Sequence, residues 1–188
     1  LFCGGVLIFA VALGLFLASA DRRVMGLARN TACFCLGACA ISLALGGLLA
    51  FLLVRTDLPG RRWALGAGAA LLFLPLYVQA AGWDAGFGRL GWYALARESW
   101  GMPGLSNWVV AIWIQGLAGV AWVTLIVGAA LRTSEPELEE LALLDGTVPQ
   151  VLWHVTLRRA LPAVLASAVW VIAMAASDMT VTDLYQIR

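Results

Sequence analysis

The sequence predicts an all-α protein, a polytopic bundle of helices that crosses a membrane several times. Two observations of composition support this fold class: 62% of the residues are hydrophobic and 12% are charged, whereas charged residues make up about 25% of an ordinary soluble domain. A third observation is the placement of the charges. They are absent from five long apolar runs, at 1–20, 30–54, 63–83, 99–131 and 160–177.

Each of these runs is long enough to be a membrane span. About 20 apolar residues in a helix cross a hydrocarbon layer about 30 Å thick, since each residue adds about 1.5 Å. One Arg or Asp at the centre of such a helix would cost about 2.5 to 3.5 kcal/mol on insertion scales. We therefore expect five spans in a lipid bilayer rather than the buried helices of a large soluble protein.

Net charge and cysteine content suggest neither nucleic-acid binding nor a metal centre. The formal net charge is +1, so we expect no nucleic-acid partner. Cys35 and Cys39 are four residues apart and share a helix face, whereas Cys33 does not lie on that face with both of them. A metal site is one interpretation, but no His or carboxylate lies near them, which favours small packing residues. We expect no disulfide, no bound metal and no cofactor.

The first two spans are expected at 1–20 and 32–54, joined by a polar link at 21–29. The first run has the length of a span and lacks the basic start of a signal peptide. A tight hairpin follows the second span, because Pro59 and Gly60 suit the central positions of a type II turn. The second span is rich in small residues that let membrane helices approach closely, namely Gly37, Ala38, Ala40, Ser42, Ala44, Gly46 and Gly47.

The third span is expected at 64–82, and Pro75 inside it should kink or loosen the helix. Proline lacks an N–H and clashes with the preceding turn. The fourth and fifth spans are expected at 109–131 and 160–177. Between spans three and four lies a longer link whose tryptophans indicate a segment at the level of the lipid headgroups, with a ligand-binding aromatic cage as the alternative; they are Trp83, Trp92, Trp100 and Trp108.

The polar segment 132–159, between spans four and five, has the pattern of two short capped helices. Ser134 can cap the first helix, and Glu137 can return a hydrogen bond as in a capping box. Pro136 is tolerated in the first turn, where its missing N–H would have no helical partner. Gly146 is well placed to end this helix in a left-handed conformation.

The second helix of this segment is expected to begin immediately afterwards. Thr147 can cap it, Pro149 lies in its first turn, and Gln150 stands three residues after the cap. Pro162 then marks a bend into the fifth span. Such a helix pair could serve only to anchor the loop at the membrane surface, but its acidic residues would sit poorly beside anionic headgroups and favour a protein partner; they are Glu135, Glu137, Glu139, Glu140 and Asp145.

This loop carries a resemblance to a known family. Its sequence Glu140-Leu141-Ala142-x-x-Asp145-Gly146 resembles the Glu-Ala-Ala-x-x-x-Gly loop of permease subunits in binding-protein-dependent ABC importers. The second Ala of the motif matches Ala142, whereas Leu141 stands where the family has the first Ala. The position of the motif between two expected spans agrees with its place in that family.

The resemblance covers about residues 29–188. The segment 48–62 resembles the first core hairpin of the iron(III) group of permeases. The chain departs from the family after the second loop helix, where the family usually has Leu-Pro and this chain has Leu157 followed by Arg158. The resemblance implies a type I importer permease core whose sixth span is missing. An extra N-terminal span and link at 1–28 would precede this core, and 132–159 would be its cytoplasmic coupling loop.

The function that the resemblance implies is that of a membrane-spanning subunit of an ATP-driven importer in the cell inner membrane. The family's loop inserts a coupling helix into a groove of a cytoplasmic ATP-binding subunit. Glu140, Ala142 and Gly146 match the motif, Asp145 stands at a position where the motif is variable, and these four residues are expected to form the coupling site. The implied partners also include an extracytoplasmic substrate-binding protein and a second permease core, and the implied cargo is ferric iron. ATP would be hydrolysed on a separate subunit, so we do not expect an enzyme. His154 is the single histidine and is expected to be an ordinary polar residue of the loop.

Two carboxylates follow the fifth span closely and are candidates for the substrate path. Asp178 and Asp183 lie near membrane depth, where carboxylates are costly and often line a path; there they would favour cationic or hydrated metal cargo. The alternative is a solvated loop beyond the membrane edge. For the chain as a whole, the alternative function is a non-transporting membrane assembly or anchor subunit, which would not need the capped helix pair. The arginines are divided almost evenly between the two sides, so the positive-inside rule does not orient the chain.

Overall fold

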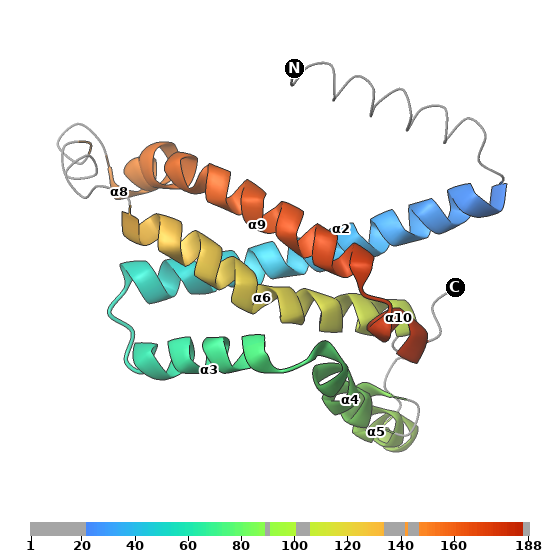
Figure 1. Ribbon diagram of the computed structural model, residues 1–188. Coiled ribbons are helices and arrows are strands. Elements are labelled where there is room, and N and C mark those ends of the chain that lie inside the picture. Colours follow the sequence, from blue (N-terminus) through green and yellow to red (C-terminus); the bar gives the residue numbers. More distant parts are fainter. Residues whose placement is uncertain (1–21, 89–90, 101–105, 134–141, 143–146, 186–188) are drawn as a thin grey trace.

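The computed structural model describes residues 22–88, 91–100, 106–133, 142 and 147–185, and within these ranges it contains helices and no strand. The all-α prediction is confirmed for this part of the chain (Figure 1). In chain order the elements are α2 (Arg22–Arg55), α3 (Arg61–Phe73), α4 (Leu76–Phe87), α5 (Trp92–Trp100), α6 (Asn107–Thr133), α8 (Val148–Val151), the π-helix η1 (Leu152–Thr156), α9 (Leu157–Ser177) and α10 (Thr180–Leu184).

Three helices are long and apolar enough to cross a membrane: α2 over Val24–Arg55, α6 over Asn107–Thr133 and α9 over Leu157–Ser177. They correspond to the second, fourth and fifth expected spans. The third expected span coincides with a sharply bent helix pair, which is either a broken span or a re-entrant loop. If the pair is one span, the candidate spans among the described residues number four. The first expected span lies outside those residues.

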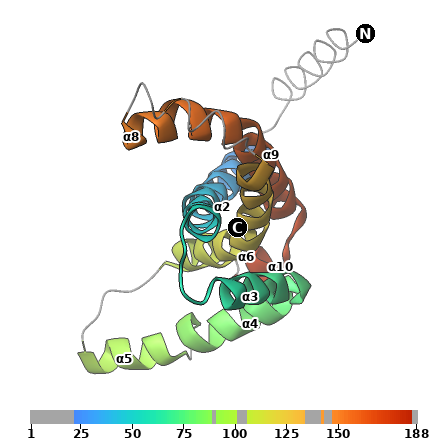
Figure 2. The same cartoon turned by 90° about the vertical axis from the view of Figure 1, so that its left-hand side faces the viewer.

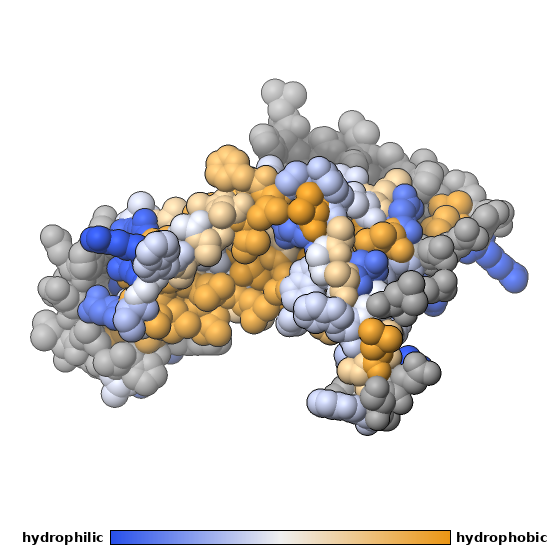
Figure 3. All heavy atoms as spheres, turned by 90° about the horizontal axis from the view of Figure 1, so that it is seen from below, coloured by the Kyte–Doolittle hydropathy of each residue, from blue (hydrophilic) through white to orange (hydrophobic). Residues whose placement is uncertain are grey.

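Hydrophobic side chains cover the middle of the bundle. Figure 3 shows them over the centre of the visible face, with hydrophilic side chains gathered at the end that carries α8. Much of this apolar surface faces outward: in the most apolar part of α9, 22% of the residues are buried within the chain. Long helices that keep apolar side chains on the outside indicate a membrane protein, because water would oppose that arrangement and lipid would not.

The helices α2, α6 and α9 all contact one another and form the core of the bundle. Figure 1 shows α2 and α6 running in the same direction and α9 returning in the opposite one. Small residues bring the backbones of α2 and α6 close together. A Cβ built on Gly46 would lie 2.6 Å from the Cβ of Val123, and one built on Gly119 would overlap Ser42 Oγ. The expected close packing of the second span is therefore confirmed.

The hairpin between α2 and α3 is the predicted type II turn. Gly60 has φ 87° and ψ 4°, which is the left-handed conformation that the second central position of this turn requires. Arg61 N–H donates to the carbonyl oxygen of Leu58 at 3.2 Å and closes the turn. Pro59 and Gly60 therefore occupy the two central positions expected for them.

Pro75 does more than kink the third expected span. The helix α3 ends at Phe73, Leu74 is extended with ψ 117°, and α4 begins at Leu76. The segment Leu76–Arg97, which begins with α4, differs in direction from α3 by 106°. The residue before a proline is pushed towards extended conformations, so the helix ends there instead of continuing through the proline.

Two stretches that were expected as links are partly helical. Residues 22–29 form the first turns of α2, because Arg, Met, Leu and Ala are good helix formers and a charge that ends an apolar run does not end a helix. Similarly, α4 continues through Trp83. The four tryptophans of the link divide into two environments: Trp83 and Trp108 pack against the core, while Trp92 and Trp100 are exposed.

The cysteines of α2 lie as the sequence indicated. Cys35 and Cys39 are buried in the core, and Cys33 is exposed. Cys35 packs in the cluster that includes Phe34 and Ile114, and Cys39 packs against α9, with its Sγ 3.9 Å from the carbonyl oxygen of Ala168. The interpretation of Cys35 and Cys39 as packing residues on one face is confirmed.

In the loop between α6 and α9, the start of the second helix was predicted correctly. The first expected helix lies outside the described residues, except that Ala142 is helical and partly buried. The second helix begins at Val148, and Thr147 N–H donates to Gln150 Oε1 at 3.0 Å. This is the return bond of a capping box, as expected.

The second loop helix is not separate from the fifth span. Helix α8, the π-helix η1 and α9 follow one another without a gap, and Pro162 lies inside α9. The expectation that the second loop helix is short and separate from the fifth span is therefore wrong, since Pro162 lies inside a helix that continues past it. Figure 2 shows that this helical run changes direction between α8 and the body of α9, so the expected bend is present.

Candidate functional site

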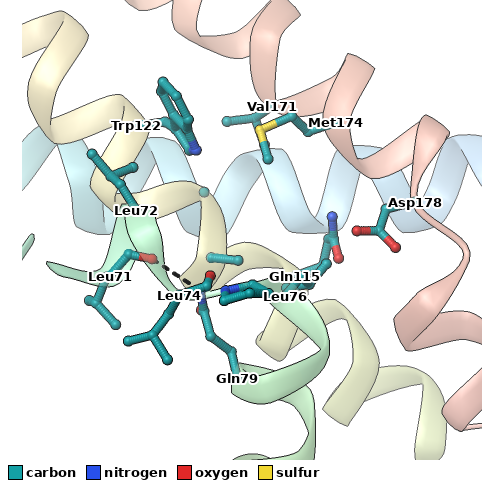
Figure 4. Close-up of a pocket in the computed structure, with 13 residues that line it drawn as sticks. Leu71, Leu72, Leu74, Leu76, Gln79, Gln115, Trp122, Val171, Met174 and Asp178 are labelled. Carbon is teal, nitrogen blue, oxygen red and sulfur yellow. Dashed lines mark hydrogen bonds between the residues drawn. The ribbon is translucent and has the colours of Figure 1, made fainter. Parts of the chain in front are cut away.

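A pocket of about 300 Å³ lies where the break between α3 and α4 faces α6 and the end of α9 (Figure 4). Most of the side chains that line it are aliphatic or aromatic, although polar atoms make up about half of its surface. The described residues that give it polar character are Gln79 on α4, Gln115 on α6 and Asp178 at the end of α9. A cavity lined mostly by apolar side chains, with a few convergent polar groups, is typical of a small-molecule site.

Gln115 is the most buried polar side chain of the pocket. It is 4% exposed, and its Oε1 has no hydrogen-bond partner among the described residues. An acceptor left in this state costs about 1 to 3 kcal/mol, which a donor supplied from outside the chain would recover. Gln115 lies within an apolar span, where an uncompensated amide is expected to have a functional reason.

Gln79 compensates for the broken helix. Its Nε2 donates to the carbonyl oxygens of Leu71 at 3.2 Å and Leu74 at 3.0 Å. These carbonyls belong to the last turn of α3 and the residue after it, where the break at Pro75 removes the regular helical donors. A side chain of α4 therefore holds the end of α3, and the irregular backbone borders a cavity, where membrane proteins tolerate it.

Asp178 ends α9 and is oriented by the backbone of the next turn. Its Oδ1 accepts a hydrogen bond from Thr180 N–H at 2.8 Å, and its own N–H donates to the carbonyl oxygen of Met174 at 3.1 Å. The side chain is partly buried and lines the pocket. Its second carboxylate oxygen has no partner among the described residues and remains able to accept a bond.

Asp178 also lines a second cavity, of about 330 Å³, between the start of α2, the end of α9 and α10. Asp183 lines this second cavity and not the first. The structure therefore brings the two carboxylates of the expected substrate path to one cavity, with Asp178 between that cavity and the pocket beside Gln115. Asn30, Thr31 and Trp108 complete a partly polar wall.

The turn after α9 is fixed against the rest of the bundle through Tyr185. Asn107 Nδ2 donates to the carbonyl oxygen of Tyr185 at 3.2 Å, and α10 contacts α4 and α6. The Tyr185 hydroxyl is buried without a hydrogen-bond partner of ordinary geometry. Burial, and next the negative charge of Asp84, raise the pKa of Tyr185 to about 12, because both disfavour the phenolate.

The residues expected to contact an ATP-binding subunit lie mostly outside the described residues. Glu140, Asp145 and Gly146 belong to this group, and Ala142 is helical and partly buried. His154 is exposed on η1, and its Nδ1 lies 3.0 Å from the carbonyl oxygen of Gln150. It has the position of an ordinary polar residue on the loop helix.

The pocket residues that the sequence did not single out are Gln79, Gln115 and Trp122. Each lies in an uncharged run, so the distribution of charged residues did not identify them. The signal that would have found the two glutamines is an amide within a membrane span, since each unsatisfied polar group in lipid costs several kcal/mol. Trp122 lines the pocket at the end away from Asp178 (Figure 4).

No protein-family model matches the chain, and no curated protein matches it. Within the part of the chain that the structure describes, no group of three or more His, Cys, Asp and Glu side chains is placed to hold a metal ion. The function is therefore inferred from the pocket, the helical run that leads to it and the motif of the preceding loop.

Proposed function

We propose that the chain is a membrane-spanning subunit of an ATP-driven importer of the cell inner membrane. In this proposal it forms part of the substrate path, and its loop at 132–159 couples to a cytoplasmic ATP-binding subunit. Its other partners are an extracytoplasmic substrate-binding protein and a second permease core. ATP is hydrolysed on the separate subunit, and the chain itself is not an enzyme.

The observation that carries the proposal is the unbroken helical run from the loop to the pocket. It begins after Thr147, passes through α8, η1 and α9, and ends at Asp178, whose carboxylate lines the cavity. At about 1.5 Å per residue the run is roughly 45 Å long. The run bends between α8 and the body of α9 (Figure 2), and η1 contacts both of these helices. A displacement of the loop end would therefore be passed to α9 through packed elements, which shift as units rather than deforming continuously.

The two ends of this run lie at opposite ends of the bundle. Figure 1 shows α8 at one end and α10 at the other. If the loop faces the cytosol, Asp178 and the second cavity lie on the side from which a substrate-binding protein delivers cargo. The π-helix Leu152–Thr156 adds support, because single-turn π-helices inside α-helices occur frequently at functional sites.

The broken third span is a further support. Discontinuous membrane helices are typical of transporters, in which they border the substrate site near the middle of the bilayer. Here the break at Pro75 borders the pocket that holds Gln115 and Asp178. The resemblance of the loop to iron(III) permeases suggests ferric iron as the cargo, and the chemistry of the pocket bears on this point separately below.

The experiment that tests the proposal uses the complete protein in its assembled complex. We expect a nucleotide-binding subunit to copurify with it. Gly146→Trp should abolish cargo-stimulated ATP hydrolysis, because a bulky residue would not fit the left-handed helix end that the sequence predicts at this position. The control is Gly66→Trp on α3, at an exposed glycine whose Cβ would meet nothing within 4 Å. Full stimulation in Gly146→Trp would contradict the coupling, and no nucleotide-binding partner at all would favour an assembly or anchor subunit.

A further inference from the structure

We propose that the pocket between the α3–α4 break, α6 and the end of α9 binds a small organic cation that carries an apolar body, of the primary-ammonium class. The identity of this ligand as cargo rests on the proposed transport function. Binding of the ligand does not depend on the transport proposal, because the side chains that would contact it all belong to this chain. The juxtaposition that points to it is a carboxylate beside an unpartnered amide oxygen at one end of a cavity whose other lining side chains are mostly apolar.

The polar end of the pocket offers acceptors and a negative charge. Asp178 is the single formally charged side chain among the described residues that line the pocket, and Gln115 Oε1 is buried without a partner. An ammonium group has three N–H donors and one positive charge. It can give one bond to Gln115 Oε1 and one to the oxygen of Asp178 that does not bind Thr180 N–H. Charge-assisted bonds of this kind are the strong ones.

The other end of the pocket fits a hydrocarbon. Gln115 and Trp122 are seven positions apart on α6, so they are separated by about 10 Å along the helix. Figure 4 shows Trp122 and Leu72 at one end of the pocket, and Gln115 and Asp178 at the other. With Val171, these side chains form a wall against which a chain of several methylene groups loses contact with water.

A metal ion is less suited to this cavity. Hard cations take about six or more oxygen ligands, whereas the described side chains that line the pocket include one carboxylate and two amides, those of Asp178, Gln79 and Gln115. An organic cation needs few polar contacts and gains the rest of its affinity from apolar burial. The second cavity adds selection by charge: Asp183 and Asp178 both line it, and a cavity with charges of one sign concentrates the opposite ion.

The binding test uses the complete chain, purified and placed in nanodiscs of zwitterionic lipid, with empty nanodiscs subtracted. Hexylamine, hexanol and hexanoate are titrated by calorimetry. We expect hexylamine to bind at least about tenfold more tightly than hexanol, since the charge-assisted bonds are lost with the alcohol. Hexanoate should not bind, because its charge is repelled by Asp178. Equal affinities for hexylamine and hexanol would overturn the proposal.

Two variants assign the binding to the pocket. Asp178→Asn keeps an oxygen for Thr180 N–H and therefore preserves the turn, but it should weaken hexylamine at least about tenfold. Gln115→Met has nearly the same shape and should weaken it severalfold. Asp57→Asn, on the exposed hairpin, makes the same chemical change away from the pocket and should leave the affinity unchanged. Unchanged affinity in Asp178→Asn, or displacement of hexylamine by stoichiometric ferric or divalent ions, would contradict the organic-cation site.

The result can be separated from the transport proposal. Amine binding that depends on Asp178, in a protein that captures no nucleotide-binding subunit, would leave the site in place and refute the importer. Capture of that subunit without selective amine binding would support the importer and refute the organic-cation site.

Discussion

Ser42 Oγ on α2 lies 2.7 Å from the carbonyl oxygen of Gly116 on α6 and 2.9 Å from that of Ala38 in its own helix. A hydroxyl carries one hydrogen, so the bond between helices and the bond within α2 share it. The contact depends on the absence of a side chain at Gly116, where a Cβ would lie 2.8 Å from the Cβ of Ile41. Because Gln115 precedes Gly116 directly, the α2–α6 contact also fixes the position of the buried amide in the pocket.

The close approach of α2 and α6 predicts different effects at two adjacent glycines. Gly46→Ala should destabilise the bundle by about 1 to 3 kcal/mol, because its Cβ would lie 2.6 Å from that of Val123. Gly47→Ala is the matched control: its Cβ would meet nothing within 4 Å, and alanine favours a helix. The free energy of unfolding in mixed detergent micelles measures both, and equal effects would contradict the packing.

The broken third span predicts a specific role for Gln79. Gln79→Leu removes the donor to the carbonyl oxygens of Leu71 and Leu74 and should cost about 0.5 to 1.5 kcal/mol. Gln115→Leu should not lower stability in this way, since Gln115 Oε1 has no partner to lose. The same unfolding assay compares them. If Gln79→Leu were neutral, the amide would not be what holds the end of α3.

The raised pKa of Tyr185 predicts a loss of stability at high pH. Below pH 10 the phenol is neutral in both the folded and the unfolded chain. Between about pH 10 and about pH 12 the unfolded chain releases this proton and the folded chain keeps it, so the free energy of unfolding falls as pH rises.

Tyr185→Phe should remove both this fall and the late phase, near pH 12, of a spectrophotometric tyrosine titration. Tyr77→Phe, at an exposed residue of α4, is the control and should keep that late phase. A titration of Tyr185→Phe that matched the parent protein would refute the assignment.

The capped start of α8 predicts local protection. Gln150→Leu removes the acceptor of the Thr147 N–H bond and should destabilise the first turn by about 0.5 to 1 kcal/mol. Hydrogen exchange should then be several times faster at the start of the run, with α9 unchanged. The exposed Arg158, further along the same run, provides the control substitution, Arg158→Leu, for which no change at Thr147 is expected. Equal protection of Thr147 in Gln150→Leu and the parent would show that the bond does not hold the helix start.

Much of the helical arrangement was predictable because it depends on local chemistry. Pro59 and Gly60 determine the turn through their own backbone preferences, and Thr147 with Gln150 determine a helix start over one turn. The buried face of Cys35 and Cys39 follows from helical periodicity. None of these features requires knowledge of distant parts of the chain.

The pocket was less predictable because it depends on contacts between distant segments. Asp178 was recognised from its position after an apolar run, but Gln115 acquires its role only when the break at Pro75 and the end of α9 come to lie beside it. The size of that break was also underestimated, since a proline within an apolar run can kink a helix or end it. The continuity of α8 with α9 runs through η1, and the sequence pattern did not predict a π-helix there.

The most direct test of the account measures whether ATP at one end of the helical run changes the chain at the other. In the reconstituted complex, with native cysteines replaced by alanine, Met179→Cys places a thiol beside Asp178, at an exposed position that lines the second cavity. We predict that ATP changes its rate of alkylation severalfold, and that Gly146→Trp abolishes the change. The same rate with and without ATP would contradict the coupling of the loop to the pocket.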